Sequence, residues 1–127
     1  MSVRSLIGAE GERAAAEFLE ARGYRIVERN YRTKRGEIDL IAEEGRTLVF
    51  VEVKARLNDR FGGPGAAVTP VKQARIARLA QHYLVRRRLS DRPCRFDVVL
   101  IWGDDPKTRR IELLPGAFEA PATRSSV

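Results

Sequence analysis

The sequence predicts an α/β domain built on a mixed β-sheet flanked by helices, with the element order α-β-β-β-α-β-β. Two stretches, at about residues 7–22 and 70–88, have apolar residues at helical spacing. Shorter apolar and β-branched segments between and after them are separated by turn residues such as Gly, Asp and Pro. The chain has 127 residues, 43% of them hydrophobic, which suits one domain with its own core. We expect that domain to span residues 1–118 and the small and polar residues 119–127 to form a disordered tail.

The first helix and the two strands after it are predicted from apolar spacing and one glycine. One side of a helix over residues 7–22 would carry Ile7, Gly11, Ala15, Phe18, Leu19 and Arg22. Gly23 is a natural stop, because glycine readily adopts the left-handed conformation that ends many helices. We expect strands over residues 24–28 and 37–41.

The second half of the chain contains the most apolar strands. A turn at residues 43–46 leads into a third strand over 47–54, whose apolar run 48–54 suggests burial on both faces. Thr69 suits the N-cap and Pro70 the first position of the second helix, which is predicted to end near Arg88. Strands over 96–102 and 109–114, joined by a turn at 104–107, complete the sheet.

Charge and composition limit the classes of function. The net charge of +7, from 24 Lys and Arg against 17 Asp and Glu, favours a polyanionic partner, with solubility as the alternative explanation. The single cysteine, Cys94, excludes an intramolecular disulfide framework and suggests a reducing compartment; we expect it to be a small buried group. No apolar stretch is long enough for a membrane span or a secretory signal, so a cytoplasmic location without membrane contact is expected.

Acidic residues inside the apolar strands are the strongest functional signal. Asp39 is followed after twelve residues by Glu52-Val53-Lys54, and Glu52 and Lys54 point to the same face of their strand. Facing or diagonal positions on adjacent antiparallel strands, about 4.5–8 Å apart, would let Asp39 and Glu52 share one cation. The turn can centre on Glu44 or Gly45, and a slip of one residue would turn Asp39 to the other face. In the alternative, Glu52 and Lys54 simply face solvent.

Two carboxylates and an amine suit phosphodiester hydrolysis. A cation held by Asp39 and Glu52 would polarise the phosphoryl oxygen and lower the pKa of a bound water. Lys54 would orient that water or stabilise the charge that develops on phosphorus. Carboxylate oxygens favour Mg²⁺, with Mn²⁺ as a substitute, and one histidine and one cysteine make a zinc site unfavourable. A glycosidase with paired carboxylates would need neither Lys54 nor a basic surface.

The spacing of Asp39, Glu52 and Lys54 resembles the PD-(D/E)XK nuclease pattern, with Ile38 where the pattern's name has proline. The wider motifs resemble the YraN-type family of predicted bacterial endonucleases over residues 7–118: Gly11-Glu12, Gly23-Tyr24, Asn30, Gly36–Ile41, Phe50–Lys54 and Arg95–Val99. The resemblance implies a restriction-endonuclease-like fold, similar to archaeal Holliday junction resolvases. It also implies a metal-dependent endonuclease acting on structured or branched DNA, and it is compatible with a homodimer.

The same resemblance assigns a third acid. Resolvase-like relatives carry an acidic residue on the first helix, and Glu12 matches it by its spacing to Gly23, so Glu12 would hold the metal through water. In the alternative, Glu12 is a solvated acid that complements the helix dipole. Glu37 suits equally a position beside Asp39 or a surface ion pair with Lys34 or Arg35. For Asp97, at the start of an apolar strand, we predict a structural salt bridge.

The second helix presents a basic stripe. Its members are Arg75, Arg78, His82 and Arg86, and Lys72 and Gln73 lie in the first turn. We predict that Lys72, Gln73, Arg75, Arg78 and Arg86 bind nucleic acid, with Lys72 or Gln73 reaching toward the active site. The alternative is a solvated helix face. The glycine-rich loop over 58–67 leaves the predicted site and either orders on nucleic acid or is an inert connection.

Two rival functions remain at this stage. One is a nucleic-acid-binding protein of the same fold without useful cleavage activity of its own. The other is a protein-interaction domain, which the positive charge disfavours. Salt-dependent DNA binding separates the second rival from the other hypotheses, and magnesium-dependent cleavage separates the nuclease from the first.

Overall fold

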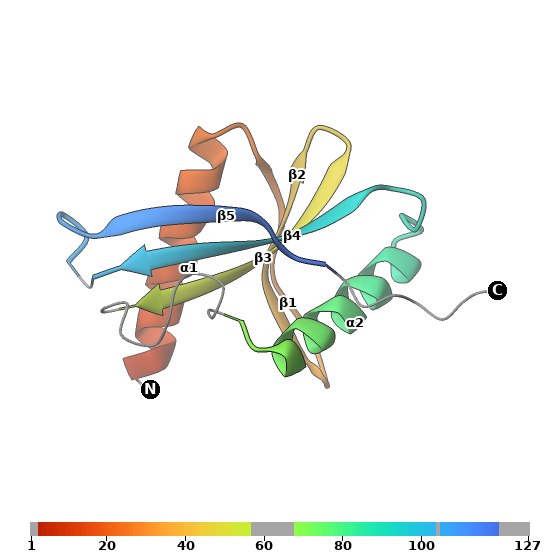
Figure 1. Ribbon diagram of the computed structural model, residues 1–127, viewed down its shortest axis with the longest axis horizontal. Helices are drawn as coiled ribbons and strands as arrows, with labels where there is room; N and C mark the ends of the chain where they lie inside the picture. The colour runs from red at the N-terminus through yellow and green to blue at the C-terminus, as the bar shows by residue number, and fades with distance from the viewer. Residues whose placement is uncertain (1–2, 57–67, 104, 120–127) are drawn as a thin grey trace.

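A five-stranded mixed sheet with one helix on each face forms the body of the protein (Figure 1). The computed structural model describes residues 3–56, 68–103 and 105–119. Its elements are α1 (Val3–Ala21), β1 (Arg25–Thr33), β2 (Gly36–Glu44), β3 (Thr47–Arg56), α2 (Pro70–Arg86), β4 (Cys94–Trp102) and β5 (Arg110–Phe118). This order confirms the predicted one. The glycine-rich loop and the residues of the predicted tail beyond 119 lie outside the described part of the chain.

The sheet follows the chain order β1-β2-β3-β4-β5. All neighbouring strands are antiparallel except β3 and β4, which are parallel. A parallel pair requires a crossover connection, and α2 lies within it. In Figure 1 the β1–β2 hairpin turns away from β3–β5 and reaches the beginning of α2. The sheet's twist therefore brings the hairpin tip to the helix that follows β3.

Each face of the sheet has its own hydrophobic core. Under α2 the buried residues include Ile41, Phe50 and Tyr83, and under α1 they include Leu19 and Val51. Phe50 and Val51 thus point to opposite faces, and both are buried, as predicted for a strand covered on both sides. Glu52 is only 7% exposed, so the solvent-facing alternative for this strand is wrong.

The helix ends follow the predicted local chemistry. Gly23 has φ 93, and the amides of Gly23 and Tyr24 donate to the carbonyls of Glu20 and Leu19, which closes α1 with a Schellman motif. Thr69 accepts a hydrogen bond from the Lys72 amide at 3.2 Å, and Pro70 opens α2. The helix ends at Arg86, two residues before the predicted end. Within the described residues, no helix is long and apolar enough to cross a membrane.

Two predictions about β4 have opposite outcomes. Asp97 is fully buried and forms the predicted salt bridge, with Nε of Arg95 at 2.9 Å from Oδ1. It also accepts hydrogen bonds from the Tyr24 hydroxyl at 3.1 Å and the Gly116 amide at 2.9 Å. Burial and the Asp97 charge raise the pKa of Tyr24 to about 12. Cys94 is exposed rather than buried, because it occupies the first position of β4, outside both cores.

Candidate functional site

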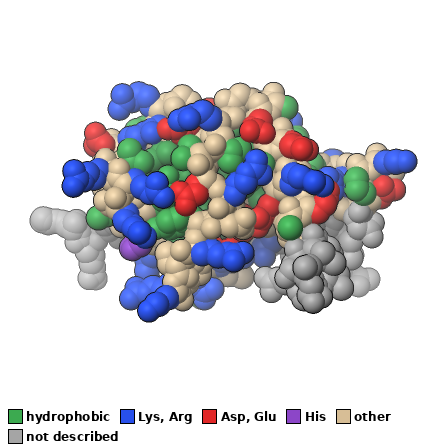
Figure 2. All heavy atoms as spheres, turned by 180° about the vertical axis from the view of Figure 1, so that it is seen from behind, with side chains coloured by type: hydrophobic (Ala, Val, Ile, Leu, Met, Phe, Trp, Pro, Cys, Tyr) green, Lys and Arg blue, Asp and Glu red, His purple; other side chains and the backbone are tan. Residues whose placement is uncertain are grey.

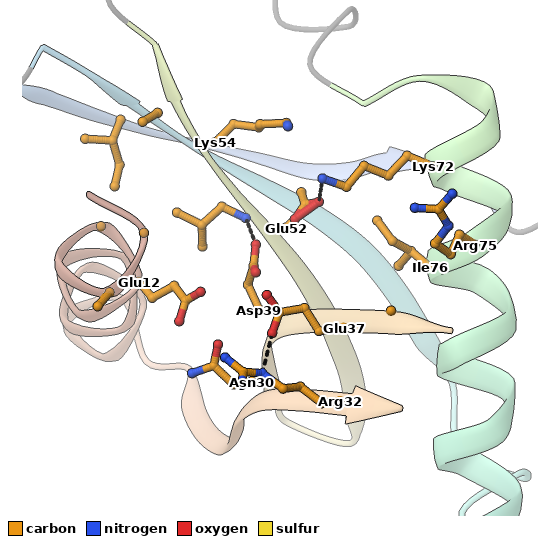
Figure 3. A pocket seen from close by; sticks show the side chains of 17 residues that line it. Glu12, Asn30, Arg32, Glu37, Asp39, Glu52, Lys54, Lys72, Arg75 and Ile76 are labelled. Carbon is orange, nitrogen blue, oxygen red and sulfur yellow. Dashed lines mark hydrogen bonds and ion pairs between the residues drawn. The ribbon is translucent and has the colours of Figure 1, made fainter. Parts of the chain in front are cut away.

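A pocket of about 620 Å³ opens between α1, the sheet and the first turns of α2. Glu12 approaches it from α1, Asp39 from β2, Glu52 and Lys54 from β3, and Lys72 from α2 (Figure 3). The structure therefore brings together the residues predicted for metal binding and hydrolysis. Arg75 also lines this pocket, whereas Gln73, Arg78 and Arg86 do not. The side-chain amide of Gln73 (Nε2) instead donates to the Val68 carbonyl at 2.9 Å, at the start of the helix.

The hairpin turn fixes the register that the sequence left open. Glu44 pairs with Thr47, so the loop is Gly45-Arg46, and Gly45 has the positive φ (60) that a tight two-residue hairpin needs. The register then runs regularly to the pair Leu40↔Val51. Next to Leu40 on β2, an Asp39 carboxylate oxygen accepts a hydrogen bond from the backbone amide of Val53 on β3 at 2.8 Å. The carboxylate is thereby held at the point where β2 and β3 separate.

A distortion in β1 accompanies Asp39. Asn30 has φ 54, a left-handed conformation that is uncommon in a strand and that asparagine tolerates better than most residues. Its neighbours are in register with β2 on both sides, Arg29 with Leu40 and Tyr31 with Ile38. Asn30 therefore lies across from Asp39 and lines the pocket. The prediction of site residues did not include Asn30; its signal in the sequence was its place among the motifs of the family resemblance.

Asp39 is strongly perturbed by its surroundings. Burial, followed by the adjacent Glu52 carboxyl, raises the pKa of Asp39 to about 9, although the Val53 hydrogen bond acts in the opposite direction. Asp39 is 9% exposed, so water does little to screen this repulsion. Burial also raises the pKa of Glu12, and the neighbouring Asn30 amide partly offsets the effect. The raised pKa favours the protonated form of Asp39 at neutral pH.

Lys72 supplies the counter-charge to Glu52. Its Nζ lies 2.7 Å from Oε2 of Glu52. Burial lowers the pKa of Lys72, but the Glu52 carboxylate outweighs burial, so the pKa is raised overall. Oε2 is buried, and among the described residues no hydrogen bond of acceptable geometry reaches it, so the contact is a short but poorly directed ion pair. Figure 3 shows the Lys54 side chain extending from β3 on the same side of the strand as Glu52.

Glu37 lies beside Asp39, as one of its two predicted roles required, but the ion partners predicted for its other role are wrong. Its carboxylate forms an ion pair at 2.8 Å with Arg32, rather than with Lys34 or Arg35. It also belongs to a group with Glu12 and Asp39, whose ligand oxygens all lie within 4.8 Å of one another. Asp39 is therefore shared by two acidic sets, one with Glu52 and one with Glu12 and Glu37. The hard carboxylate oxygens of Glu12, Glu37 and Asp39 form a donor set that suits a divalent cation such as Mg²⁺.

Comparison with known proteins identifies the family. Residues 11–101 match the model of a family described as uncharacterised protein family UPF0102. This chain belongs to the UPF0102 family. A UPF0102 protein of Symbiobacterium thermophilum is 54% identical over 114 residues, which cover 90% of this chain and 97% of that protein. UPF0102 proteins of Geotalea uraniireducens (49% identical, 89% of each chain) and Syntrophus aciditrophicus (51% identical, 88% of this chain and 87% of that protein) are similar over almost the same length. The family resemblance found in the sequence is thereby confirmed.

Proposed function

We propose that this UPF0102 protein is a metal-dependent endonuclease that hydrolyses phosphodiester bonds in nucleic acid. The supporting observation is the buried Asp39–Glu52 pair at the wall of an open pocket, with the pKa of Asp39 raised by burial and by Glu52. Two buried carboxylates side by side are costly unless something neutralises them. A Mg²⁺ ion, or Mn²⁺ in its place, would do so, with Asp39 and Glu52 as ligands and Glu12 holding it through water.

Each side chain has a defined part in this chemistry. When bound, the ion supplies polarisation of the phosphoryl group and activation of a water. The Val53 amide fixes the orientation of the Asp39 carboxylate. Lys54 orients the attacking water and stabilises the charge that develops on phosphorus. The water oxygen forms the new bond to phosphorus, the bond to the leaving oxygen breaks, and the leaving oxygen takes up a proton.

Lys72 connects the metal site with the substrate. In the metal-free site its ammonium neutralises Glu52. A divalent cation bound by Glu52 would compete with Lys72 for this carboxylate, because the two positive charges repel each other at short distance. Lys72 is then available to a substrate phosphate at the edge of the pocket. This exchange fits its predicted role in nucleic-acid binding.

The proposed substrate is DNA of branched or otherwise structured form, as the resemblance to resolvases suggests, and the proposed assembly is a homodimer. The +7 charge supports a polyanion. Lys72, Gln73, Arg75, Arg78 and Arg86 are the proposed contacts on α2. Figure 2 shows basic side chains interspersed with acidic ones over one face, so the charge forms no unbroken band there. Specific arginines, rather than a uniform surface, would then guide the substrate.

A second candidate function is nucleic-acid binding without useful cleavage. The observation in its favour is the Lys72–Glu52 ion pair, which occupies the metal site with an internal cation. In that case Mg²⁺ would fail to displace Lys72, and the acids would serve only to position α2. Binding would persist in EDTA and would not change when Mg²⁺ is added.

The decisive experiment combines metal titration with cleavage. Purified protein is incubated with labelled four-way junction, flap, single-stranded and duplex DNA, with Mg²⁺, Mn²⁺ or EDTA, and Mg²⁺ binding is measured by calorimetry. We expect Glu52→Gln to lower both cleavage and metal binding by roughly 100-fold or more, because a catalytic ion contributes several kcal/mol. Glu20→Gln, an exposed acid on α1, is the matched control. Full cleavage by Glu52→Gln would refute the assignment.

A further inference from the structure

A second pocket, of about 990 Å³, lies between the tip of the β1–β2 hairpin and α2. The hairpin contributes Lys34 and Arg35, and α2 contributes Arg75, Arg78 and His82. None of the described residues that line it is an aspartate or a glutamate. This composition differs from that of the first pocket, which contains four carboxylates. An anionic ligand is therefore the electrostatic complement of the second pocket.

Arg75 joins the two pockets, since it lines both. Its position depends on Gly36 at the hairpin tip. Gly36 has φ 142, and a Cβ there would lie 3.2 Å from Cδ of Arg75 and 3.5 Å from Cδ1 of Leu79. The missing side chain lets the hairpin pack closely on α2, with the Arg75 stem between them. A chain of phosphates bound at the metal site would therefore meet the Arg75 guanidinium and then the second pocket.

The second pocket also has an apolar surface. Val71, Ala74 and Leu79 line it; Leu79 is buried at 3% exposed, whereas Val71 is 71% exposed and accessible to a ligand. Lysines and arginines alone would suit the backbone of any duplex. Cations beside the exposed Val71 and the adjacent Ala74 suit a nucleotide whose base is unpaired, because the phosphate meets the cations and the base face can cover the apolar side chains.

His82 is held at the rim of the pocket. The Tyr31 hydroxyl lies 2.7 Å from Nδ1 of His82, and the two rings are 6.4 Å apart. Tyr31 is buried in the core under α2. The imidazole thus has a fixed position on an otherwise exposed helix face, which favours a formed site over a mobile charged surface.

We propose that this second pocket binds an unpaired nucleotide of the strand that passes through the metal site. The inference rests on the proposed nuclease function and deepens it. The substrate has a single-stranded segment next to the cleaved bond, as in a flap or an opened junction. Arg75 holds the phosphate between the two pockets, Arg78 and Arg35 hold the next one, and the base lies against Val71 and Ala74.

The test measures binding alone, in EDTA, so that it does not depend on cleavage. Fluorescence anisotropy compares a labelled single-stranded 12-mer, the same 12-mer with abasic sites, and a duplex of equal length. We expect the wild type to bind the intact single strand roughly 5-fold or more tightly than the abasic one, because only the intact strand has bases whose apolar surface can be buried against Val71 and Ala74. Equal affinity for the intact and abasic strands would overturn the proposal.

Two matched pairs of variants locate the contact. Val71→Asp places a carboxylate in the pocket and should abolish the preference for intact over abasic DNA. Val85→Asp introduces the same charge at another exposed valine of α2, outside both pockets, and should retain it. Arg78→Ala should weaken single-strand binding more than Arg13→Ala, which removes the same charge from an exposed position of α1 outside both pockets. Thermal unfolding checks that each variant is folded.

The outcomes distinguish this proposal from the nuclease hypothesis. A loss of base preference in Val71→Asp, with no metal-dependent cleavage by the wild type, supports the subsite and contradicts the nuclease. If the wild type cleaves with metal but Val71→Asp and Val85→Asp affect binding equally, the result supports the nuclease and overturns the subsite. A poly-glutamate peptide that displaces the 12-mer at equal concentration of charges would also overturn it, because the pocket would then bind acidic chains without need of a base.

Discussion

Two buried acidic centres on neighbouring strands have opposite surroundings. Asp97 on β4 is fully buried and receives hydrogen bonds from Arg95, Tyr24 and the Gly116 amide. Asp39 and Glu52, on β2 and β3, are also buried, but they face each other at an open pocket and are balanced by one lysine of α2. A buried acid with a full set of donors stabilises the fold. A buried acid that repels another acid retains capacity to bind a cation.

The contrast is only partly visible from local sequence. Asp97 lies between Phe96 and Val98, and Glu52 lies between Val51 and Val53, so each is a single acid in an apolar strand. The difference lies in the cationic side chain that reaches each acid. Asp97 faces the arginine two residues earlier on its own strand, whereas the lysine that reaches Glu52 comes from the helix after β3.

The largest effect is expected for the loss of the structural acid. Asp97→Ala should lower the free energy of unfolding by about 3–5 kcal/mol, because it leaves the Tyr24 hydroxyl and the Gly116 amide without their acceptor and Arg95 with only Glu44 as an ion partner. Tyr24→Phe, which removes one hydroxyl that donates to Asp97 and accepts from Arg95, should cost about 1–2 kcal/mol. Urea unfolding measures both. A cost for Asp97→Ala no greater than that for Tyr24→Phe would contradict the structural assignment.

At the candidate site, removal of a buried acid should raise the free energy of unfolding at high pH rather than lower it. The folded pKa of Asp39, about 9, lies above its unfolded value of about 3.9, so the folded state holds a proton that the unfolded state releases. The stabilisation that the folded state gains from this proton is fully present below about pH 4, and it is lost as the pH rises from about 4 to 9. In EDTA, Asp39→Asn should therefore equal the wild type at low pH and exceed it in stability at pH 8.

Urea unfolding at several pH values, with and without Mg²⁺, tests this expectation. Saturating Mg²⁺ should stabilise the wild type but not Asp39→Asn, since a bound ligand stabilises the state that binds it. The contrary result is a difference in free energy of unfolding between wild type and Asp39→Asn that is the same at pH 4 and pH 8 in EDTA. It would show that the buried pair is already compensated, as Asp97 is.

The role of Lys54 can be tested by comparing the effects of one substitution on cleavage rate and on DNA affinity. Lys54→Ala should lower the cleavage rate by roughly 100-fold, with little change in DNA affinity, because its contribution arises in the transition state. Single-turnover cleavage and anisotropy in EDTA separate the two quantities. Equal losses of rate and affinity would make Lys54 a phosphate clamp rather than a participant in hydrolysis.

The smallest effect is expected for the internal counter-charge. Lys72→Met retains most of the aliphatic stem but removes the ammonium, and it should raise Mg²⁺ affinity on the order of 10-fold, since a like charge at 4 Å opposes the ion by about 1–4 kcal/mol. Calorimetric titration measures this, with Lys107→Met, an exposed turn residue, as the control. Weaker Mg²⁺ binding would mean that Lys72 supports the metal instead of competing with it.

The sequence predicted what depends on local pattern. Apolar spacing located both helices, and the apolar run around Glu52 identified the central strand and its acid. β1 was predicted to end at Glu28 but reaches Thr33, because an edge strand can carry Arg29, Asn30 and Arg32 without an apolar signal. For the same reason β5 continues to Phe118, past Pro115 and Gly116.

Within the site, the limits have a physical cause. Asp39 and Glu52 were identifiable because ionised groups in buried strands are costly. The backbone conformation of Asn30 and the contact of Lys72 with Glu52 arise from tertiary packing between segments distant in sequence. The place of Lys72 in the first turn of the second helix predicted its approach to the site but not its pairing with Glu52, and no local pattern predicts the backbone conformation of Asn30.

The two edges of the sheet restrict how this chain can assemble. β1 presents exposed Arg25 and Arg29 along its length, and β5 contains Pro115, which has no amide hydrogen, next to a shift in its register with β4. Repeated positive charge on one edge, and proline with irregular pairing on the other, oppose the addition of a further strand. Two copies of the chain are therefore poorly suited to extend one continuous sheet. A homodimer, and equally an early aggregate, would have to form through helical or loop surfaces instead.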